Sequence, residues 1–203
     1  LLEMCLKQPK RPNLRKRRCK NLMSDLMQDD PVQILAQIDV PDDFPEARLR
    51  AAVRAVVKQQ SFPSTAECSI VITNDETVRS YNAQFRGIDK PTDVLSFPAD
   101  APDVPVELDD SDDFEGENEA AYLGDLILSL PYIQRHAESE SHTLSDELVL
   151  AVVHGTLHLL GFDHDNPENQ SKMWAVQAEI LASLGVDIQV PLFEFDDDES
   201  ENG

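Results

Sequence analysis

Three histidines at a fixed spacing constrain the fold of this chain more than any other feature of its sequence. Residues 154–164 read HGTLHLLGFDH, so His154 and His158 lie four positions apart and His164 follows after a glycine. Side chains four residues apart share one face of an α-helix, so the segment predicts a helix that presents two imidazoles together. Gly161 can end that helix in the left-handed conformation, which turns the chain and brings His164 back toward the other two histidines.

Three imidazoles without a fourth protein ligand are typical of an open, catalytic metal site rather than a closed structural one. We therefore predict that His154, His158 and His164 bind one transition-metal ion, with zinc the first choice and another transition metal the alternative. For any single histidine an ordinary core or surface position is the better interpretation, but these are three of only five histidines, at a specific spacing. We expect the other two, His136 and His142, to be surface residues without partners.

The spacing H-x-x-x-H-x-x-G-x-x-H is also that of the metzincin peptidases, in which a glutamate after the first histidine is the general base. Here that position is Gly155, which cannot accept a proton. A metallopeptidase therefore requires another acid as its base. Asp163 and Asp165 flank the third histidine, where they can orient an imidazole or handle a proton, or simply cap the turn.

Strand patterns and helix patterns alternate along the chain, and together they predict an α+β fold. We expect Asp42 or Asp43 to cap the first helix, with Pro45 in its first turn, and Thr143 with Asp146 to form a capping box before the histidine helix. The fold is then a small mixed β-sheet packed with about five helices, one of which carries the metzincin-like metal helix and turn. The predicted strands span residues 32–40, 69–73, 94–97 and 123–129, and the predicted helices span about 45–60, 75–85, 131–139, 144–158 and 170–184.

Charge is distributed unevenly along the 203 residues, although the formal net charge is -22. Eight of the 17 lysines and arginines lie between residues 7 and 20, and acids concentrate at 109–119 and 194–201. Such blocks are usually solvated segments, so the net charge says little about the surface that does chemistry. The predicted organisation is a basic leader at 1–26 that is disordered or a mis-assigned start, one domain at 27–190 with an acidic surface insertion at 99–120, and an acidic tail at 191–203.

The three cysteines indicate a reducing compartment. Cys5, Cys19 and Cys68 are an odd number without paired spacing, which argues against a disulfide framework. The basic leader lacks the apolar run of a signal peptide, and no stretch of about eighteen apolar residues occurs anywhere in the chain. The sequence therefore predicts a cytoplasmic protein with no membrane partner.

Three blocks of the sequence resemble the YbeY family of endoribonucleases. The family signature H-G-x-L-H-L-x-G-x-D-H matches residues 154–164 at every fixed position. Residues 82–98, NAQFRGIDKPTDVLSFP, are similar to the family's Arg-Gly and Thr-Asp-Val-Leu-Ser-Phe-Pro segment, and residues 123–125, Leu-Gly-Asp, begin a strand like the family's next block. The blocks follow the family's order between about residues 32 and 185.

The resemblance implies a single-domain fold, a three-histidine zinc site and single-strand-specific endoribonuclease activity. The implied biological roles are 3′-end maturation of 16S ribosomal RNA and ribosome quality control. The implied partners are ribosomal RNA, the small ribosomal subunit and ribosomal proteins or a ribosome-associated GTPase, but not DNA. By position, Arg86 corresponds to an arginine considered functional in the family, and its guanidinium can bind a phosphate and stabilise developing negative charge. The alternative is a structural ion pair of Arg86 with Asp89 or Asp93.

Two other functions remain as alternatives, a metallopeptidase and a non-catalytic, metal-stabilised ribosome assembly factor. A purely structural zinc normally takes four protein ligands, which disfavours the assembly factor. Thr92, Asp93 and Ser96 lie in a signature block, but we first interpret them as turn and strand-end residues that shape the pocket.

Overall fold

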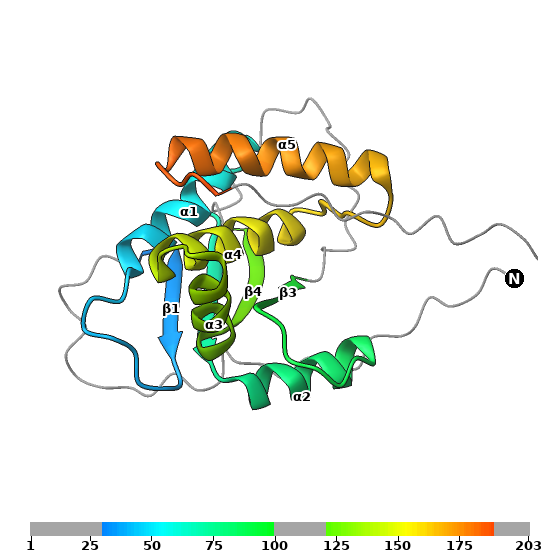
Figure 1. Ribbon diagram of the computed structural model, residues 1–203. Helices are drawn as coiled ribbons and strands as arrows, with labels where there is room; N and C mark the ends of the chain where they lie inside the picture. Colours follow the sequence, from blue (N-terminus) through cyan, green and yellow to red (C-terminus); the bar gives the residue numbers. More distant parts are fainter. Residues whose placement is uncertain (1–29, 100–120, 189–203) are drawn as a thin grey trace, which may run out of the picture.

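A computed structural model of the chain describes residues 30–99 and 121–188 (Figure 1). The predicted basic leader and acidic tail, and all but the first residue of the predicted acidic insertion, lie outside these residues, so the predicted domain bounds stay a prediction. None of the described helices is long and apolar enough to cross a membrane. The elements are, in order, β1 (Val32–Ala36), α1 (Glu46–Gln59), β2 (Glu67–Thr73), α2 (Asp75–Arg86), β3 (Val94–Pro98), β4 (Tyr122–Ser129), α3 (Leu130–Glu140), α4 (Leu144–Leu159) and α5 (Pro167–Ser183).

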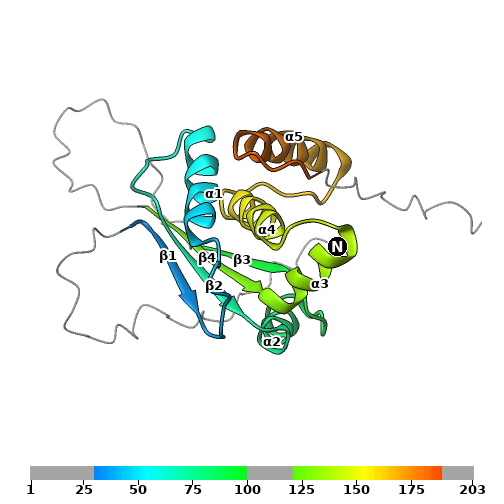
Figure 2. The same ribbon diagram turned by 60° about the vertical axis from the view of Figure 1, so that its left-hand side comes forward.

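The strands form one mixed sheet in the order β1-β2-β4-β3. β1 and β4 both pair with β2 in parallel, whereas β3 pairs with β4 antiparallel. α1 and α4 cover one face of this sheet, α5 packs on α4 and α1, and α2 lies against the opposite face (Figure 2). The described residues thus contain the mixed sheet and five helices that the sequence predicts, so the α+β prediction is confirmed.

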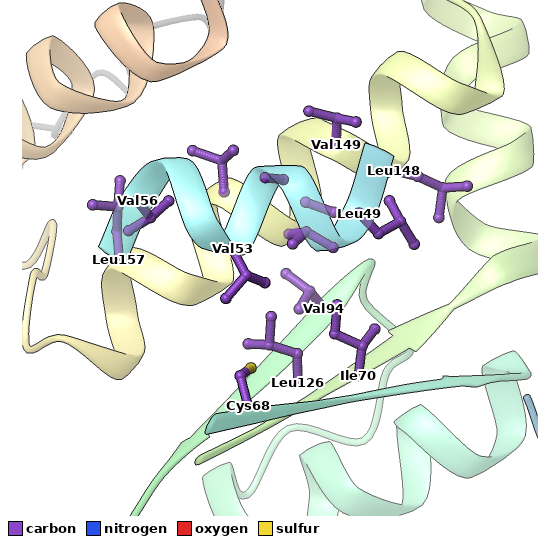
Figure 3. Close-up of a cluster of buried hydrophobic side chains, with 14 of the residues drawn as sticks. Leu49, Val53, Val56, Cys68, Ile70, Val94, Leu126, Leu148, Val149 and Leu157 are labelled. Carbon is purple, nitrogen blue, oxygen red and sulfur yellow. The ribbon is translucent and has the colours of Figure 1, made fainter. Parts of the chain in front are cut away.

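The main core lies between the sheet and the helices α1 and α4 (Figure 3). Leu49 of α1 and Leu148 and Leu157 of α4 are fully buried, and they face Ile70 and Leu126 of the sheet. Buried side chains occur on nearly every side of α4, because the sheet and α1 pack on it from one direction and α5 from the other. The helix that carries two of the histidines is therefore held from both sides.

α4 crosses the sheet at a glycine. A Cβ atom at Gly155 would lie 2.8 Å from Cδ2 of Leu126 and 3.1 Å from Cγ2 of Val94. The hydroxyl of Ser96 donates a hydrogen bond of 3.0 Å to the carbonyl oxygen of Gly155, which joins β3 to α4. This contact fits the structural role predicted for Ser96, and it shows that Gly155 faces the sheet.

The start of α4 is capped as predicted. The hydroxyl of Thr143 accepts a hydrogen bond from the backbone N–H of Asp146 at 3.1 Å and donates to the Asp146 carboxylate at 2.7 Å. The helix therefore begins where the capping pattern placed it.

β1 is shorter than predicted, because its pairing partner ends. The predicted strand ran to residue 40, but β1 stops at Ala36, and the last sheet hydrogen bond on this side runs from the N–H of Gln37 to the carbonyl of Ile72. β2 ends at Thr73 since the side chain of Asn74 caps α2. Residues beyond Gln37 have no strand beside them to pair with.

Two helix starts also differ from the prediction. α1 begins after Pro45 without a side-chain cap, so neither Asp42 nor Asp43 caps it. Those aspartates occupy a turn closed by a hydrogen bond from Phe44 to Pro41, and the residue before a proline is disfavoured in helical conformation. α5 begins at Pro167, three residues earlier than predicted, because Asn166 caps it and a proline fits the first helical position.

An ion pair between α1 and α4 makes part of the stability depend on pH. The guanidinium of Arg48 lies 2.7 Å from the carboxylate of Asp146. Partial burial acts to raise the pKa of Asp146, but hydrogen bonds from Thr143 and Arg48 and the charge of Arg48 bring it below 3.8. A lowered folded pKa stabilises the protein above the unfolded pKa, and this contribution is lost as the pH falls through the folded value.

We predict that Asp146→Asn lowers the free energy of unfolding at pH 7 by about 0.5–1 kcal/mol, since the pair is partly exposed. The difference from wild type should shrink below about pH 4. Urea unfolding at pH 7, 5 and 3 measures the difference in the free energy of unfolding between variant and wild type. Asp42→Asn in the exposed turn is the control. An equal deficit at pH 7 and pH 3 would contradict the prediction.

Candidate metal centre

The second half of α4 and the turn after it bring three imidazoles together. The Nε2 atoms of His154 and His158 lie 3.1 Å apart. One ring nitrogen from each of these histidines and one from His164 all lie within 4.8 Å of one another. In residues 30–99 and 121–188 no other group of three or more His, Cys, Asp and Glu side chains meets this spacing. The structure therefore gathers the three predicted ligands in one place.

The turn at Gly161 returns the third histidine to the helix. Gly161 has a φ of 87°, its N–H donates to the carbonyl of His158 at 3.1 Å, and the N–H of Phe162 donates to the carbonyl of Leu157 at 3.1 Å. This is a Schellman motif, whose left-handed residue is most often glycine. The predicted left-handed conformation of Gly161 is confirmed.

The same turn carries Asp163 and Asp165, and both accept hydrogen bonds from nearby residues. The carboxylate of Asp163 accepts the backbone N–H of His164 at 2.7 Å. The carboxylate of Asp165 accepts from the side-chain amides of Asn166 and Asn169 at 3.0 and 2.8 Å. The Asp163 contact matches the turn-capping interpretation, whereas these contacts of Asp165 go to side-chain amides, and Asn166 caps α5.

Hydrogen bonds fix the tautomer of both histidines on α4. The Nδ1 atom of His158 lies 2.9 Å from the carbonyl oxygen of Phe162, and the Nδ1 atom of His154 lies 3.0 Å from the amide Oε1 of Gln177. A backbone carbonyl only accepts hydrogen bonds, so Nδ1 of His158 carries the proton and its Nε2 carries a lone pair. The same holds for His154 with the amide oxygen of Gln177 turned toward it. This is the arrangement by which proteins orient a metal-binding histidine.

Burial keeps the two imidazoles neutral. It lowers the pKa of His154, and it lowers the pKa of His158 to about 4, with the neighbouring imidazoles as a further cause for both groups. Neutral imidazole is the form that binds metal. With both Nδ1 atoms protonated, the two Nε2 lone pairs face each other across 3.1 Å. A cation relieves that repulsion, and tetrahedral zinc places its nitrogen ligands roughly 3.3 Å apart, so the donor set fits zinc.

α5 covers the imidazoles with two side chains that sequence reasoning missed. The Trp174 ring lies edge-on to His154 and His164, with centroid distances of 5.9 and 5.4 Å. Gln177 lies one turn further along and is 1% exposed. Trp174 is the only tryptophan of the chain, which is a weak signal. No local pattern marks Gln177, which contacts His154 across 23 residues.

Two acidic residues outside the helices, Asp93 and Asp163, act against the lowered pKa values of the imidazoles on α4. Burial lowers the pKa of His154, and the hydrogen bond with Gln177 and the negative charge of Asp93 partly oppose this. The hydroxyl of Thr92 donates to the Asp93 carboxylate at 2.8 Å. Position 155, where the peptidases carry their base, faces the sheet and holds a glycine. The site thus lacks the metzincin base.

Arg86 ends α2, on the other face of the sheet from α4 (Figure 2). Its side chain is exposed, and within residues 30–99 and 121–188 it forms no ion pair and no hydrogen bond to the imidazoles. Asp89 instead binds both Nε and Nη2 of Arg79, at 2.7 and 2.8 Å. In the described residues neither Asp89 nor Asp93 pairs with Arg86, so the alternative of a structural ion pair is wrong, and the predicted role of Arg86 stays a prediction.

The expectation that His136 and His142 lack partners is also wrong. The Nδ1 atom of His136 lies 3.3 Å from the carboxylate of Glu147, and the Nδ1 atom of His142 contacts the other oxygen of that carboxylate. Glu147, in the first turn of α4, is only 5% exposed, and a buried carboxylate requires hydrogen-bond donors. Both contacts lie at the opposite end of α4 from the three imidazoles.

Comparison with known proteins identifies the family. A family model described as Endoribonuclease YbeY matches residues 35–185. The chain belongs to the YbeY family. The Endoribonuclease YbeY of Acetivibrio thermocellus is 35% identical over 152 residues, which cover 74% of this chain and 93% of that protein. The Endoribonuclease YbeY of Heliobacterium modesticaldum is 41% identical over 135 residues, which cover 65% of this chain and 78% of that protein.

The fold of this YbeY-family chain also occurs in a solved structure. The solution structure of TM1509 from Thermotoga maritima matches with a TM-score of 0.50 and 24% identity, over 75% of this chain and 88% of that one. The three histidines, Arg86 and the residues that contact them all lie within the part matched by the family model. The resemblance found in the sequence is confirmed.

Proposed function

We propose that this chain is a metal-dependent endoribonuclease that cuts single-stranded RNA, with one zinc or other transition-metal ion held by His154, His158 and His164. The observation that carries the proposal is the convergence of three imidazoles whose two α4 members keep their Nε2 lone pairs free. The family membership supplies the substrate class, since the relatives are named endoribonucleases.

The residues of the chain have separate tasks in this proposal. A bound ion supplies Lewis acidity to a phosphoryl oxygen and lowers the pKa of a water molecule toward neutrality. His154 and His158 hold their ligating nitrogens in place through their Nδ1–H bonds. Trp174 covers two of the rings and limits the access of water from the α5 side. Arg86, exposed at the end of α2, binds a phosphate of the RNA strand.

The proposed biological substrate is the precursor of 16S ribosomal RNA, at its 3′ end, in the cytoplasm, with a further role in ribosome quality control. A net charge of -22 opposes binding to free RNA, because affinity for nucleic acid comes largely from neutralised phosphates. We therefore propose that the small ribosomal subunit supplies the affinity, through ribosomal proteins or a ribosome-associated GTPase.

The test compares substrates under identical conditions. The protein, purified with its metal, is given a 3′-extended 16S precursor, the same sequence annealed to a complementary strand, and an unfolded protein. Cleavage of the single-stranded RNA alone supports the proposal. Cleavage of the unfolded protein alone would establish a metallopeptidase instead, and bound metal without any cleavage would establish a non-catalytic assembly factor.

We predict that Arg86→Ala lowers kcat/KM for RNA cleavage about tenfold to a hundredfold while the metal content stays at the wild-type level. The reason is the loss of a permanently charged phosphate-binding group that has no ion pair in the described residues. The control is Arg54→Ala. It removes an exposed arginine of α1 that forms an ion pair with Asp30. Equal losses in both variants would show a general charge effect and would contradict a specific role for Arg86.

A further inference from the structure

Gln177 is a buried amide whose side chain ends at the metal centre, although it belongs to a different helix. It is 1% exposed, and its Oε1 atom lies 3.0 Å from Nδ1 of His154. A buried amide needs hydrogen-bond partners, and this one has an imidazole as its partner rather than a backbone group. The contact links α5 directly to the imidazoles.

The two histidines of α4 differ in what holds them. His158 is anchored by the carbonyl of Phe162, a backbone group that the turn at Gly161 provides whatever the side chains are. His154 lies inside α4, where the nearby backbone carbonyls are already bonded within the helix. Its Nδ1–H therefore depends on the side chain of Gln177.

This dependence matters because His154 has a competing tautomer. Its Nε2 lies 3.1 Å from Nε2 of His158, close enough for one imidazole to donate a proton to the other. If His154 carried its proton on Nε2, the Nε2 atoms of His154 and His158 would be the donor and the acceptor of one hydrogen bond. Neither atom would then have a lone pair free for a metal ion. An acceptor at Nδ1 favours the other tautomer, in which both Nε2 atoms are free.

We propose that Gln177 is a positioning residue that selects the metal-binding tautomer of His154, an inference that rests on the proposed metal site. The amide oxygen does this without adding a negative charge to the site. A carboxylate at the same position accepts the same proton more strongly and raises the basicity of the ligand. Gln177→Glu should therefore keep the function, whereas Gln177→Leu, similar in size but without an acceptor, should lose it.

The test measures tautomers and metal affinity rather than activity. Nitrogen-15 NMR of the metal-free protein reports which ring nitrogen of His154 carries the proton, and competition with a chelator gives the Kd for zinc. We expect the Nδ1–H form in the wild type and in Gln177→Glu, and a substantial Nε2–H population in Gln177→Leu. We expect the zinc Kd of Gln177→Leu to rise about tenfold to a hundredfold, and that of Gln177→Glu to equal the wild-type value or fall below it.

A matched control separates positioning from loss of packing. Ile180→Val trims a fully buried side chain one turn further along α5, so it loosens the same helix without removing the acceptor. Its zinc Kd should stay within about twofold of wild type. If it weakens zinc as much as Gln177→Leu does, Gln177 acts only through packing and the proposal is overturned.

Two further outcomes would overturn the proposal. One is a wild-type His154 in the Nε2–H form, a result that decides the matter even if Gln177→Leu does not fold. The other is a folded Gln177→Leu with wild-type tautomer and wild-type zinc affinity. A wild-type protein that binds no zinc but shows the Nδ1–H form refutes the proposed metal site instead, so the two failures are distinguishable.

Discussion

His158→Ala will lose bound metal and RNA cleavage together, with the cleavage rate falling about a thousandfold or more. The described residues offer three ligands for the ion, and this substitution leaves two. It also removes the ring that the turn carbonyl of Phe162 holds in place. A metal ion contributes several kcal/mol of transition-state stabilisation, and about 4 kcal/mol corresponds to a factor of a thousand.

The measurement pairs metal content by mass spectrometry with cleavage of the single-stranded precursor. The control is His136→Ala, which removes a half-exposed histidine of α3 that contacts Glu147 at the other end of α4. It should keep both the metal and the cleavage rate. A His158→Ala protein that has no metal yet cuts RNA at the wild-type rate would separate nuclease activity from the three histidines and would refute the proposed mechanism.

Gly155→Glu will prevent folding, because it places a long, charged side chain against buried residues where α4 crosses the sheet. Even a Cβ atom there would lie 2.8 Å from Leu126 and 3.1 Å from Val94. A glutamate adds a buried charge to this overlap, and each effect costs several kcal/mol. The expected loss is at least about 5 kcal/mol, which is comparable to the whole stability of a typical domain.

The yield of folded protein, circular dichroism and thermal unfolding measure this effect. Gly155→Ala should be intermediate, with an overpacking penalty of about 1–3 kcal/mol that the better helix propensity of alanine partly offsets. Ala178→Glu on the exposed side of α5 is the control, and it should change stability by no more than about 0.5 kcal/mol. A stable, folded Gly155→Glu protein would show that α4 can move away from the sheet.

The same packing explains the missing peptidase base in physical terms. In the metzincin pattern the residue after the first histidine is a glutamate at the metal. In this chain that residue is Gly155, where a side chain would be directed at β3 and β4. Its carbonyl accepts a hydrogen bond from the hydroxyl of Ser96. A base at position 155 is therefore incompatible with this arrangement of helix and sheet.

The parts of the structure that were predictable from sequence are those that depend on local interactions. The start of α4 after Thr143 follows from a capping pattern four residues long, and the turn after the helix follows from Gly161. The gathering of His154 and His158 follows from helical periodicity alone. Each of these signals lies within a few residues of the feature that it predicts.

The parts that were not predictable depend on distant neighbours. β1 ends early because its partner β2 ends, and the sequence of residues 37–40 does not show where β2 ends. His136 and His142 have a partner because Glu147 is buried beneath α3, which a polar sequence does not reveal. In the sequence, Gln177 looks like any glutamine on an amphipathic helix. Its contact with His154 depends on how α5 packs over α4.

Gln177 follows all three histidines in the sequence, and this order has a consequence for biosynthesis. Synthesis proceeds from the N-terminus, so all three histidines emerge from the ribosome before the residue that orients the first of them. A growing chain that ends before α5 has one anchored imidazole on α4 and one unanchored imidazole. In the proposed arrangement, the metal centre is thus completed only after α5 has emerged, later than the sheet and α4.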